Sequence, residues 1–168
     1  MIKGVDHSDS TSVRVITVSA VVVTRPDGAV VTVRKKGTDR FMLPGGKWEP
    51  GEAPLDCAVR ELGEELGVSL APERLTPLGR FDTATANEPG FRLVSEVFAA
   101  ETDVRVEPRA EIAEARWLTT TELRALAELP EDECAPWAPL LVRVVREGSW
   151  WRRYRGSECD DRDECEEQ

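Results

Sequence analysis

The stretch GGKWEPGEAPLDCAVRELGEELGV, residues 45–68, limits what this chain can fold into more than any other part of it. In its second half, apolar residues recur with helical spacing, so that at about 100° per residue they share one face. These residues are Leu55, Ala58, Val59, Leu62 and Leu66. The pattern predicts a helix over residues 52–66, which follows a glycine-rich loop and ends at Gly67 in a left-handed conformation.

A second face of the same predicted helix is acidic. Glu61, Glu64 and Glu65 stand at i, i+3 and i+4, so their carboxylates lie together and repel one another. Such a cluster suggests a hard divalent cation, and Mg²⁺ takes oxygen ligands while keeping waters for a phosphate substrate. The preceding glycine-rich loop can bring backbone groups close to a phosphate or a metal ion. A solvated acidic helix would explain the charges, but it would not explain the glycines.

The spacing resembles, at every fixed position, the Nudix box GX5EX7REUXEEXGU, in which U is aliphatic. The matching residues are Gly46, Glu52, Arg60, Glu61, Leu62, Glu64, Glu65, Gly67 and Val68. Seven fixed residues at roughly one in twenty each make a chance match on the order of one in a billion per start position. The resemblance implies an α/β fold, the Nudix α/β/α sandwich with a mixed, largely antiparallel sheet.

The resemblance also implies a reaction, the hydrolysis of a phosphoanhydride in a nucleoside diphosphate linked to a group X. By resemblance, Glu61, Glu64 and Glu65 bind Mg²⁺ or Mn²⁺, with the Gly45 carbonyl as a further ligand. Glu61 is alternatively the general base, and a carboxylate beside a metal ion can do either job.

Other residues of the box are expected to support this site. Arg60, counted with the candidate catalytic residues, is expected to hold the loop against the helix through an ion pair with Glu52. Gly46 and Gly67 are assigned to structural support. Many family members add one more acid from outside the box, and the segment EIAEARW favours Glu111 for this role. Its alternatives are Glu114, Glu96 and Glu101.

The candidate residues for substrate choice lie mostly in regions whose sequence patterns are less specific than the Nudix box. The segment LPEDECAPWAPLL, residues 129–141, is similar to a stretch of oxidised-purine nucleoside triphosphatases in which two acids read the base edge. Glu131 and Asp132 would be those acids, and a solvated acidic loop is the alternative. Trp48 or Phe41 is a candidate for stacking on a base, although Trp48 alternatively only caps the loop. The basic residues 35–40 either meet substrate phosphate or form a solvated turn.

Three functions remain open at this point. The first is a nucleoside triphosphate pyrophosphohydrolase of the MutT type, acting on oxidised or normal nucleotides. The second is a hydrolase of ADP-ribose, nucleotide sugars or dinucleotides. The third is a Nudix-fold sensor or binding module without catalysis, which the intact box argues against.

Composition restricts the partners. The net charge of −10 argues against nucleic-acid polymers and anionic membranes, and no apolar run approaches the roughly 20 residues of a membrane span. We expect a cytoplasmic protein that binds a small-molecule nucleotide, and we leave open whether it forms a homodimer. The four cysteines have no zinc-site spacing, and the single histidine, His7, precedes the predicted domain.

The chain is predicted to contain one domain. Residues 1–12 form a polar disordered leader, residues 13–155 the domain, and residues 156–168 a disordered tail with seven acids and one arginine. Strands are predicted at residues 13–24, 29–34, 41–44, 78–86, 91–100 and 115–118. Two further helices are predicted at residues 119–128 and 137–147, and a capping box of Thr119 and Glu122 opens the first of them.

Overall fold

The computed structural model describes residues 14–130 and 133–148. Within these ranges, seven strands in one sheet are combined with three α-helices and the 3₁₀ turn η1. The elements in order are β1 (Arg14–Thr24), β2 (Val30–Lys35), β3 (Phe41–Met42), β4 (Gly45–Lys47), α1 (Pro54–Leu66), η1 (Pro72–Arg74), β5 (Thr76–Ala84), β6 (Phe91–Glu101), β7 (Ile112–Leu118), α2 (Thr120–Glu128) and α3 (Pro139–Glu147).

Strand β1 lies at the centre of the sheet. It pairs in parallel with β6 along its whole length, from Arg14 opposite Phe91 to Thr24 opposite Glu101. On its other edge it pairs with β4 in the middle and with β2 at its end, both antiparallel. The strand order is β3-β2-β1-β6-β5, with β4 beside β1 and β7 beside β2. The sheet is therefore mixed, as predicted.

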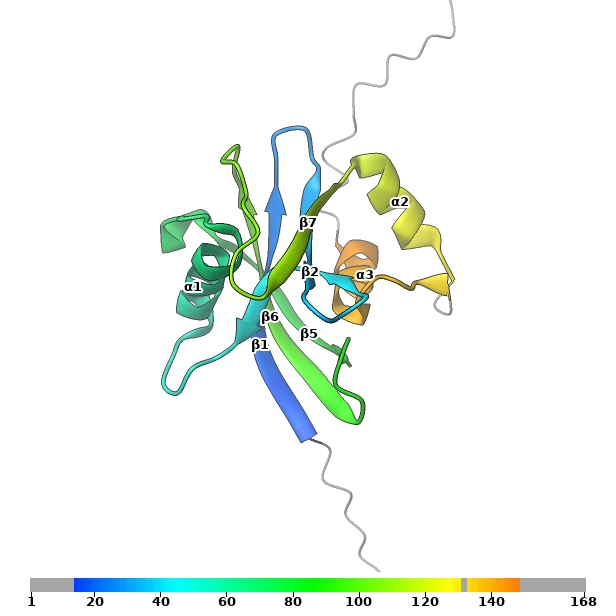
Figure 1. Ribbon diagram of the computed structural model, residues 1–168, viewed down its shortest axis with the longest axis horizontal. Coiled ribbons are helices and arrows are strands. Elements are labelled where there is room, and N and C mark those ends of the chain that lie inside the picture. Colours follow the sequence, from blue (N-terminus) through cyan, green and yellow to red (C-terminus); the bar gives the residue numbers. More distant parts are fainter. Residues whose placement is uncertain (1–13, 131–132, 149–168) are drawn as a thin grey trace, which may run out of the picture.

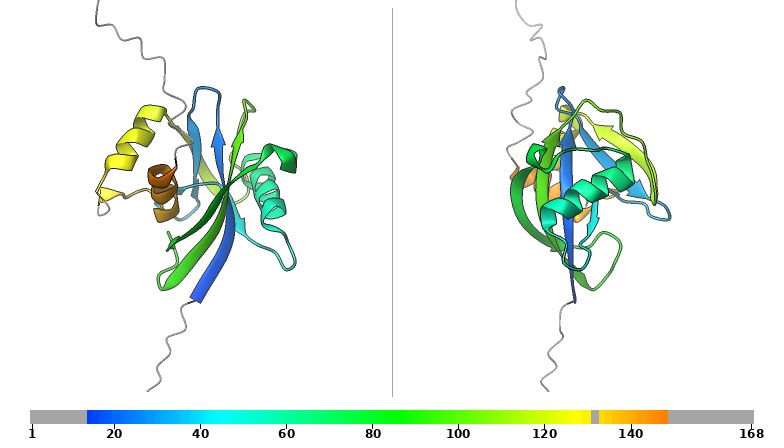
Figure 2. Two further views of the ribbon diagram at one scale, coloured as in Figure 1. Left: turned by 180° about the vertical axis from the view of Figure 1, so that it is seen from behind. Right: turned by 90° about the vertical axis from the view of Figure 1, so that its left-hand side faces the viewer.

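The helices cover both faces of this sheet (Figures 1 and 2). Since side chains alternate along a strand, β1 supplies two apolar cores. Val21 and Val23 pack in the core that contains α1, and Ala20 and Val22 pack in the core that contains α2 and α3. The result is the three-layer α/β/α arrangement that the sequence predicted, with α1 on one face and α2 and α3 on the other.

Helix α1 begins at Pro54, two residues later than predicted. Proline at the first helical position needs no hydrogen-bond partner for a backbone N–H, and Ala53 before it is extended. Glu52 therefore lies in the loop, where its side chain accepts a hydrogen bond from the Glu49 N–H. The helix ends as predicted at Gly67, which is left-handed with φ 66°.

Three other boundaries differ from the prediction for reasons of pairing. Strand β7 starts at Ile112 rather than residue 115, because it pairs with β2 over the whole length of that strand. Helix α3 starts at Pro139, since Trp137 makes an isolated bridge with Phe41. Strand β5 spans Thr76–Ala84 rather than residues 78–86, in register with β6.

The capping box of α2 is present as predicted, with Thr119 and Glu122 each bonding the other's backbone N–H. The predicted leader, residues 1–12, and the predicted tail, residues 156–168, lie outside the described ranges. Within those ranges, no helix combines the length and the apolar character needed to cross a membrane.

Candidate active site

Two glycines let strand β4 lie directly against its neighbours. A Cβ built on Gly46 would be 2.1 Å from Glu61 Oε1, and one built on Gly45 would be 2.1 Å from the Ser19 carbonyl oxygen. No side chain can occupy either position without moving the backbone or the Glu61 carboxylate. The glycine-rich loop therefore brings the backbone of β4 into contact with the acidic face of α1.

Arg60 fastens the loop to the helix. Its guanidinium binds both Glu52 oxygens, at 2.7 Å from Nε and 2.9 Å from Nη2, and it also donates to the Lys47 carbonyl at 3.2 Å. These hydrogen bonds lower the pKa of Glu52 to about 2 and raise the pKa of Arg60. The expected ion pair between Arg60 and Glu52 is thus present, and it holds the loop in place.

Trp48 also anchors the loop. Its indole N–H donates to Ser19 Oγ at 2.9 Å, and Ser19 Oγ donates to the Pro54 carbonyl at 2.6 Å. Trp48 is absent from the described lining of the neighbouring cavity, whereas Lys47 and Glu49 on either side line it. This geometry is the one that the loop-capping alternative requires, and the stacking of Trp48 on a base stays a prediction.

The three acids of helix α1 have different surroundings. Glu61 and Glu65 are buried, and the Glu64 side chain is 55% exposed. Arg60 Nη1 lies 2.8 Å from Glu61 Oε1 and 3.2 Å from Glu64 Oε2. The Gly45 N–H donates to Glu65 Oε2 at 2.9 Å.

Burial makes the charges of the two inner acids costly. It raises the pKa of Glu65 to about 7, although the Lys35 ammonium and the Gly45 N–H oppose the shift. Burial also raises the pKa of Glu61, against the effect of Arg60. Both carboxylates therefore favour a nearby cation.

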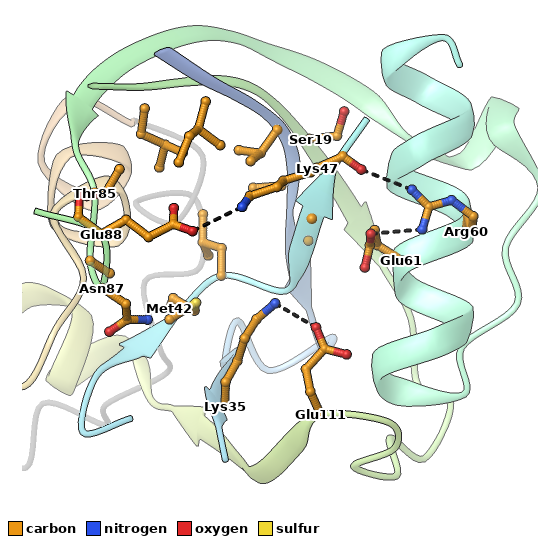
Figure 3. Close-up of a pocket in the computed structure, with 18 of the residues that line it drawn as sticks. Ser19, Lys35, Met42, Lys47, Arg60, Glu61, Thr85, Asn87, Glu88 and Glu111 are labelled. Carbon is orange, nitrogen blue, oxygen red and sulfur yellow. Dashed lines mark hydrogen bonds and ion pairs between the residues drawn. The ribbon is translucent and has the colours of Figure 1, made fainter. Parts of the chain in front are cut away.

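Lys35, at the end of β2, forms ion pairs with one acid of helix α1 and with one acid just before strand β7. Its Nζ lies 3.3 Å from Glu65 Oε1. It also lies 2.8 Å from Glu111 Oε1, the ion pair that Figure 3 shows. The Lys35 ammonium group therefore lies between Glu111 and Glu65 of helix α1 and contacts both carboxylates. The pKa of Lys35 is raised, because its two carboxylate partners outweigh the effect of burial, and the pKa of Glu111 is lowered by Lys35. Glu114 instead pairs with Arg34 at 3.0 Å.

The acids of helix α1 offer oxygen ligands for a divalent cation. Nowhere in residues 14–130 and 133–148 do three His, Cys, Asp or Glu side chains converge as ligands. In this structure Arg60 pairs with Glu61 and Lys35 pairs with Glu65. Glu65 Oε1 is buried, and its 3.3 Å ion-pair contact with Lys35 Nζ lacks the geometry of a hydrogen bond within the described residues. Carboxylate oxygens that are buried and poorly satisfied fit a hard cation such as Mg²⁺.

A cavity of about 590 Å³ opens beside these residues. Glu61, Lys35 and Glu111 line its charged end, and the β5–β6 loop lies opposite, where Glu88 pairs with Lys47 at 3.0 Å (Figure 3). The remaining wall combines polar residues, among them Ser19, Thr85 and Asn87, with apolar ones. The apolar residues are Ile16, Val18, Ala20, Met42, Leu43, Ala86 and Leu93.

Sequence reasoning missed part of this cavity. Lys47 lies inside the box, so its charge was a usable signal, whereas nothing in the sequence pointed to the loop containing Glu88. Phe41 packs against Trp137, with ring centroids 5.7 Å apart, and does not line the cavity. Glu131 and Asp132 lie outside the described residues, so their role stays a prediction.

This chain is similar to known proteins in sequence and in fold. The chain is 38% identical over 106 residues to a Nudix hydrolase of Pseudomonas aeruginosa, a match to 62% of this chain and 57% of that protein. It is 30% identical over 123 residues to an isopentenyl-diphosphate Delta-isomerase of Cereibacter sphaeroides, covering 66% of this chain and 68% of the relative. The MutT protein of Methanosarcina mazei Go1 superimposes with a TM-score of 0.63 at 18% identity, covering 86% of this chain and 97% of that one.

The family model agrees with the box and the fold. The NUDIX domain model matches residues 13–138, which is well over half of the chain. The glycine-rich loop, the Arg60–Glu52 pair and the acidic face of α1 are all within this match. The chain belongs to the Nudix family.

Proposed function

We propose that this protein is a divalent-metal-dependent hydrolase that breaks a phosphoanhydride in a nucleoside diphosphate-X substrate. The observation that carries the proposal is the position of Glu61 and Glu65, two buried carboxylates of α1 at the glycine-rich strand β4. Glu61 lines a cavity of about 590 Å³ together with Lys35, Lys47 and Arg60. An arrangement that combines oxygen ligands with cationic side chains suits a diphosphate and its counter-ion.

Each residue has a proposed task. Glu61, Glu64, Glu65 and the Gly45 carbonyl would hold the cation, preferably Mg²⁺, which when bound would neutralise phosphate oxygens and lower the pKa of a water molecule. Lys35 and Lys47 face the same cavity and would bind phosphate oxygens. Arg60 acts by positioning, since it holds the loop and the Glu61 carboxylate at once. Glu61 and Glu111 are the candidates for accepting a proton from water.

The test is hydrolysis of a nucleotide panel with and without Mg²⁺. The panel contains nucleoside triphosphates, their oxidised forms, ADP-ribose, nucleotide sugars and dinucleotides. Pyrophosphate as product would identify a triphosphatase of the MutT type, and AMP with a sugar phosphate would identify the alternative class of hydrolase. Binding without turnover of any member would support the sensor and contradict the proposal.

The base-reading role of Glu131 and Asp132 is tested in the same panel. If these acids contact a base, replacing them by Gln and Asn changes the ranking of bases and leaves the metal requirement unchanged, because a mismatched base leaves a buried polar group unpaired. An unchanged ranking of kcat/KM values would contradict that role.

A second candidate function has an observation in its favour. The described side chains that line the cavity include no aromatic ring for a base to stack on, whereas Ile16, Val18 and Leu93 offer aliphatic contacts. An aliphatic diphosphate fits such a wall, and one relative at 30% identity is named an isopentenyl-diphosphate Delta-isomerase. Isomerisation of isopentenyl diphosphate, followed by NMR in the presence of Mg²⁺, would establish this candidate, and release of phosphate or pyrophosphate from it would not.

A further inference from the structure

A second cavity, here called the α3 cavity, lies on the opposite side of the sheet from α1. It has a volume of about 600 Å³ and is lined mainly by residues of α3 and of the segment before it. Three of its lining residues are arginines and one, Glu147, is a carboxylate. The principal lining residues are Arg40, Thr83, Trp137, Val142, Arg143 and Arg146.

Two of these guanidinium groups are held in place by backbone carbonyls. Arg40 Nη1 donates to the Trp137 carbonyl at 3.3 Å, and Arg143 Nη1 donates to the Asp82 carbonyl at 2.8 Å. Arg143 Nε also donates to Glu147 at 2.7 Å. A guanidinium has five N–H donors, which is more than these bonds use. The arginines are therefore oriented for a further acceptor.

Thr83 supplies a second, independent observation. Its Oγ1 is buried and has no hydrogen-bond partner among the described residues, and Thr83 lines the α3 cavity. A buried hydroxyl without a partner carries a desolvation cost. An acceptor bound in the cavity would satisfy this hydroxyl as well as the two arginines.

The α3 cavity lies next to the cavity of the candidate active site. Thr83 lines the α3 cavity, and its register partner Leu93 lines the other. Arg40 and Met42, two residues apart, likewise line one cavity each. A substrate with its diphosphate at Glu61 and Lys35 can therefore extend toward Arg40 and Arg143.

We propose that the α3 cavity binds a phosphate monoester carried by the substrate at a distance from the bond that is broken. The proposal rests on the proposed function for the identity of the substrate, but the binding of the monoester does not require turnover. Arg40 and Arg143 would donate charge-assisted hydrogen bonds to its oxygens, and Trp137 would pack against the neighbouring part of the substrate. These residues would be specificity-determining, since they touch a part of the substrate that does not react.

Matched pairs of nucleotides test this proposal. NADPH differs from NADH, and coenzyme A from dephospho-coenzyme A, by one phosphate monoester. Calorimetric titration of the full chain with each compound, in EDTA to prevent hydrolysis, should show about tenfold tighter binding of the phosphate-bearing member of at least one pair, as charge-assisted hydrogen bonds predict. In Arg143→Gln and in Arg40→Gln this preference should fall below about threefold.

Two controls separate the arginines from general effects. Arg80→Gln removes an arginine from β5 that is 67% exposed and outside the α3 cavity, and it should keep the preference. In the double variant Arg143→Gln/Glu147→Gln the net charge equals that of the wild type, and the preference should still be lost. Melting temperatures of all variants show whether each one folds.

The outcomes are distinct. Equal affinities within both pairs for the wild type, including no measurable binding, would overturn the proposal, as would a preference that survives in both single variants. Failure of the proposed function has a different signature, because the Mg²⁺ panel would then show no hydrolysis while the binding preference persists.

Discussion

The two faces of the sheet treat charge differently. On the α1 face, Glu61 and Glu65 are buried inside a helix surface that also buries Leu62 and Leu66. On the opposite face, α3 buries only aliphatic residues and places Arg143 and Arg146 at the edge of a cavity. On the α1 face, the buried charged residues come from one short segment of the sequence, where they occupy positions that apolar side chains could fill. On the opposite face, the charged residues at the cavity come from segments that are distant in the sequence.

The α1 face tolerates this burial because each of the two buried carboxylates has at least one cationic or N–H partner. Glu61 has Arg60, and Glu65 has the Gly45 N–H and Lys35. A buried charge without such partners would cost several kcal/mol. Ion pairs and hydrogen bonds thus connect the glycine-rich loop, helix α1 and strand β2 on this face. On the opposite face, α3 packs through aliphatic side chains.

The largest expected effect is on turnover from the α1 face. Glu64→Gln or Glu65→Gln should each lower kcat by about 10³-fold or more in Mg²⁺, since loss of a charged ligand removes several kcal/mol of transition-state stabilisation. Steady-state rates would measure this loss, and circular dichroism would show that the fold is retained. A near wild-type kcat in either variant would remove that residue from the proposed metal site.

The second effect tests the close approach of β4 to α1. Gly46→Ala should lower kcat by about 10²-fold, because a Cβ at this position displaces the Glu61 carboxylate and small misplacements of catalytic groups are costly. Gly63→Ala is the matched control. Its Cβ would meet nothing nearer than 4.0 Å, so it should keep activity and stabilise α1 by about 0.5–1 kcal/mol. Equal activities of the two variants would contradict the role given to Gly46.

A third, smaller effect separates two acids of the same segment. Glu111→Gln should lower kcat about tenfold, because Glu111 lies beside Lys35 at the active-site cavity. Glu114→Gln should leave kcat unchanged, because Glu114 is half exposed and pairs with Arg34. Rates of both variants, measured side by side, decide the assignment, and the opposite pattern would transfer the role to Glu114.

Part of the candidate site and the class of fold were predictable from the sequence. The box was predictable residue by residue, since Gly46, Glu52, Arg60 and the acids of α1 lie within one stretch and fixed spacing implies fixed geometry. The mixed α/β fold followed from the resemblance. The bridge from Glu65 through Lys35 to Glu111 depends on the pairing of β2 with β7, and periodicity does not give strand partners.

The α3 cavity could not be predicted from the sequence, because the sequence pattern does not show which distant segments lie next to one another. Arg40, Thr83 and Arg143 come from three separate segments, and only the register of β5 with β6 and the packing of α3 bring them together. The helix start at Pro54 was missed because Glu52, which fits the acidic pattern of a first turn, serves instead as the partner of Arg60. In both cases, tertiary contacts override local preference.

The smallest expected effect concerns stability on the face opposite α1. Thr119→Ala removes the side chain that accepts the Glu122 N–H, and it should lower the free energy of unfolding by about 1 kcal/mol at pH 7, as loss of an N-cap does. Thr121→Ala, exposed within α2, is the control and should not destabilise. Turnover should be unchanged in both variants, in contrast to every variant of the box carboxylates.

The Glu122 half of the capping box adds a pH dependence whose sign follows from its pKa. Hydrogen bonds from the Thr119 backbone N–H and from Arg116 lower the pKa of Glu122 below its ordinary value of 4.5. A lowered folded-state pKa contributes stability above the ordinary value, and this is lost as pH falls through the folded-state pKa. Urea unfolding should therefore show wild type more stable than Glu122→Gln at pH 7, with the difference shrinking below pH 4.5. A difference that stays constant with pH would mean that the charge of Glu122 does not stabilise α2.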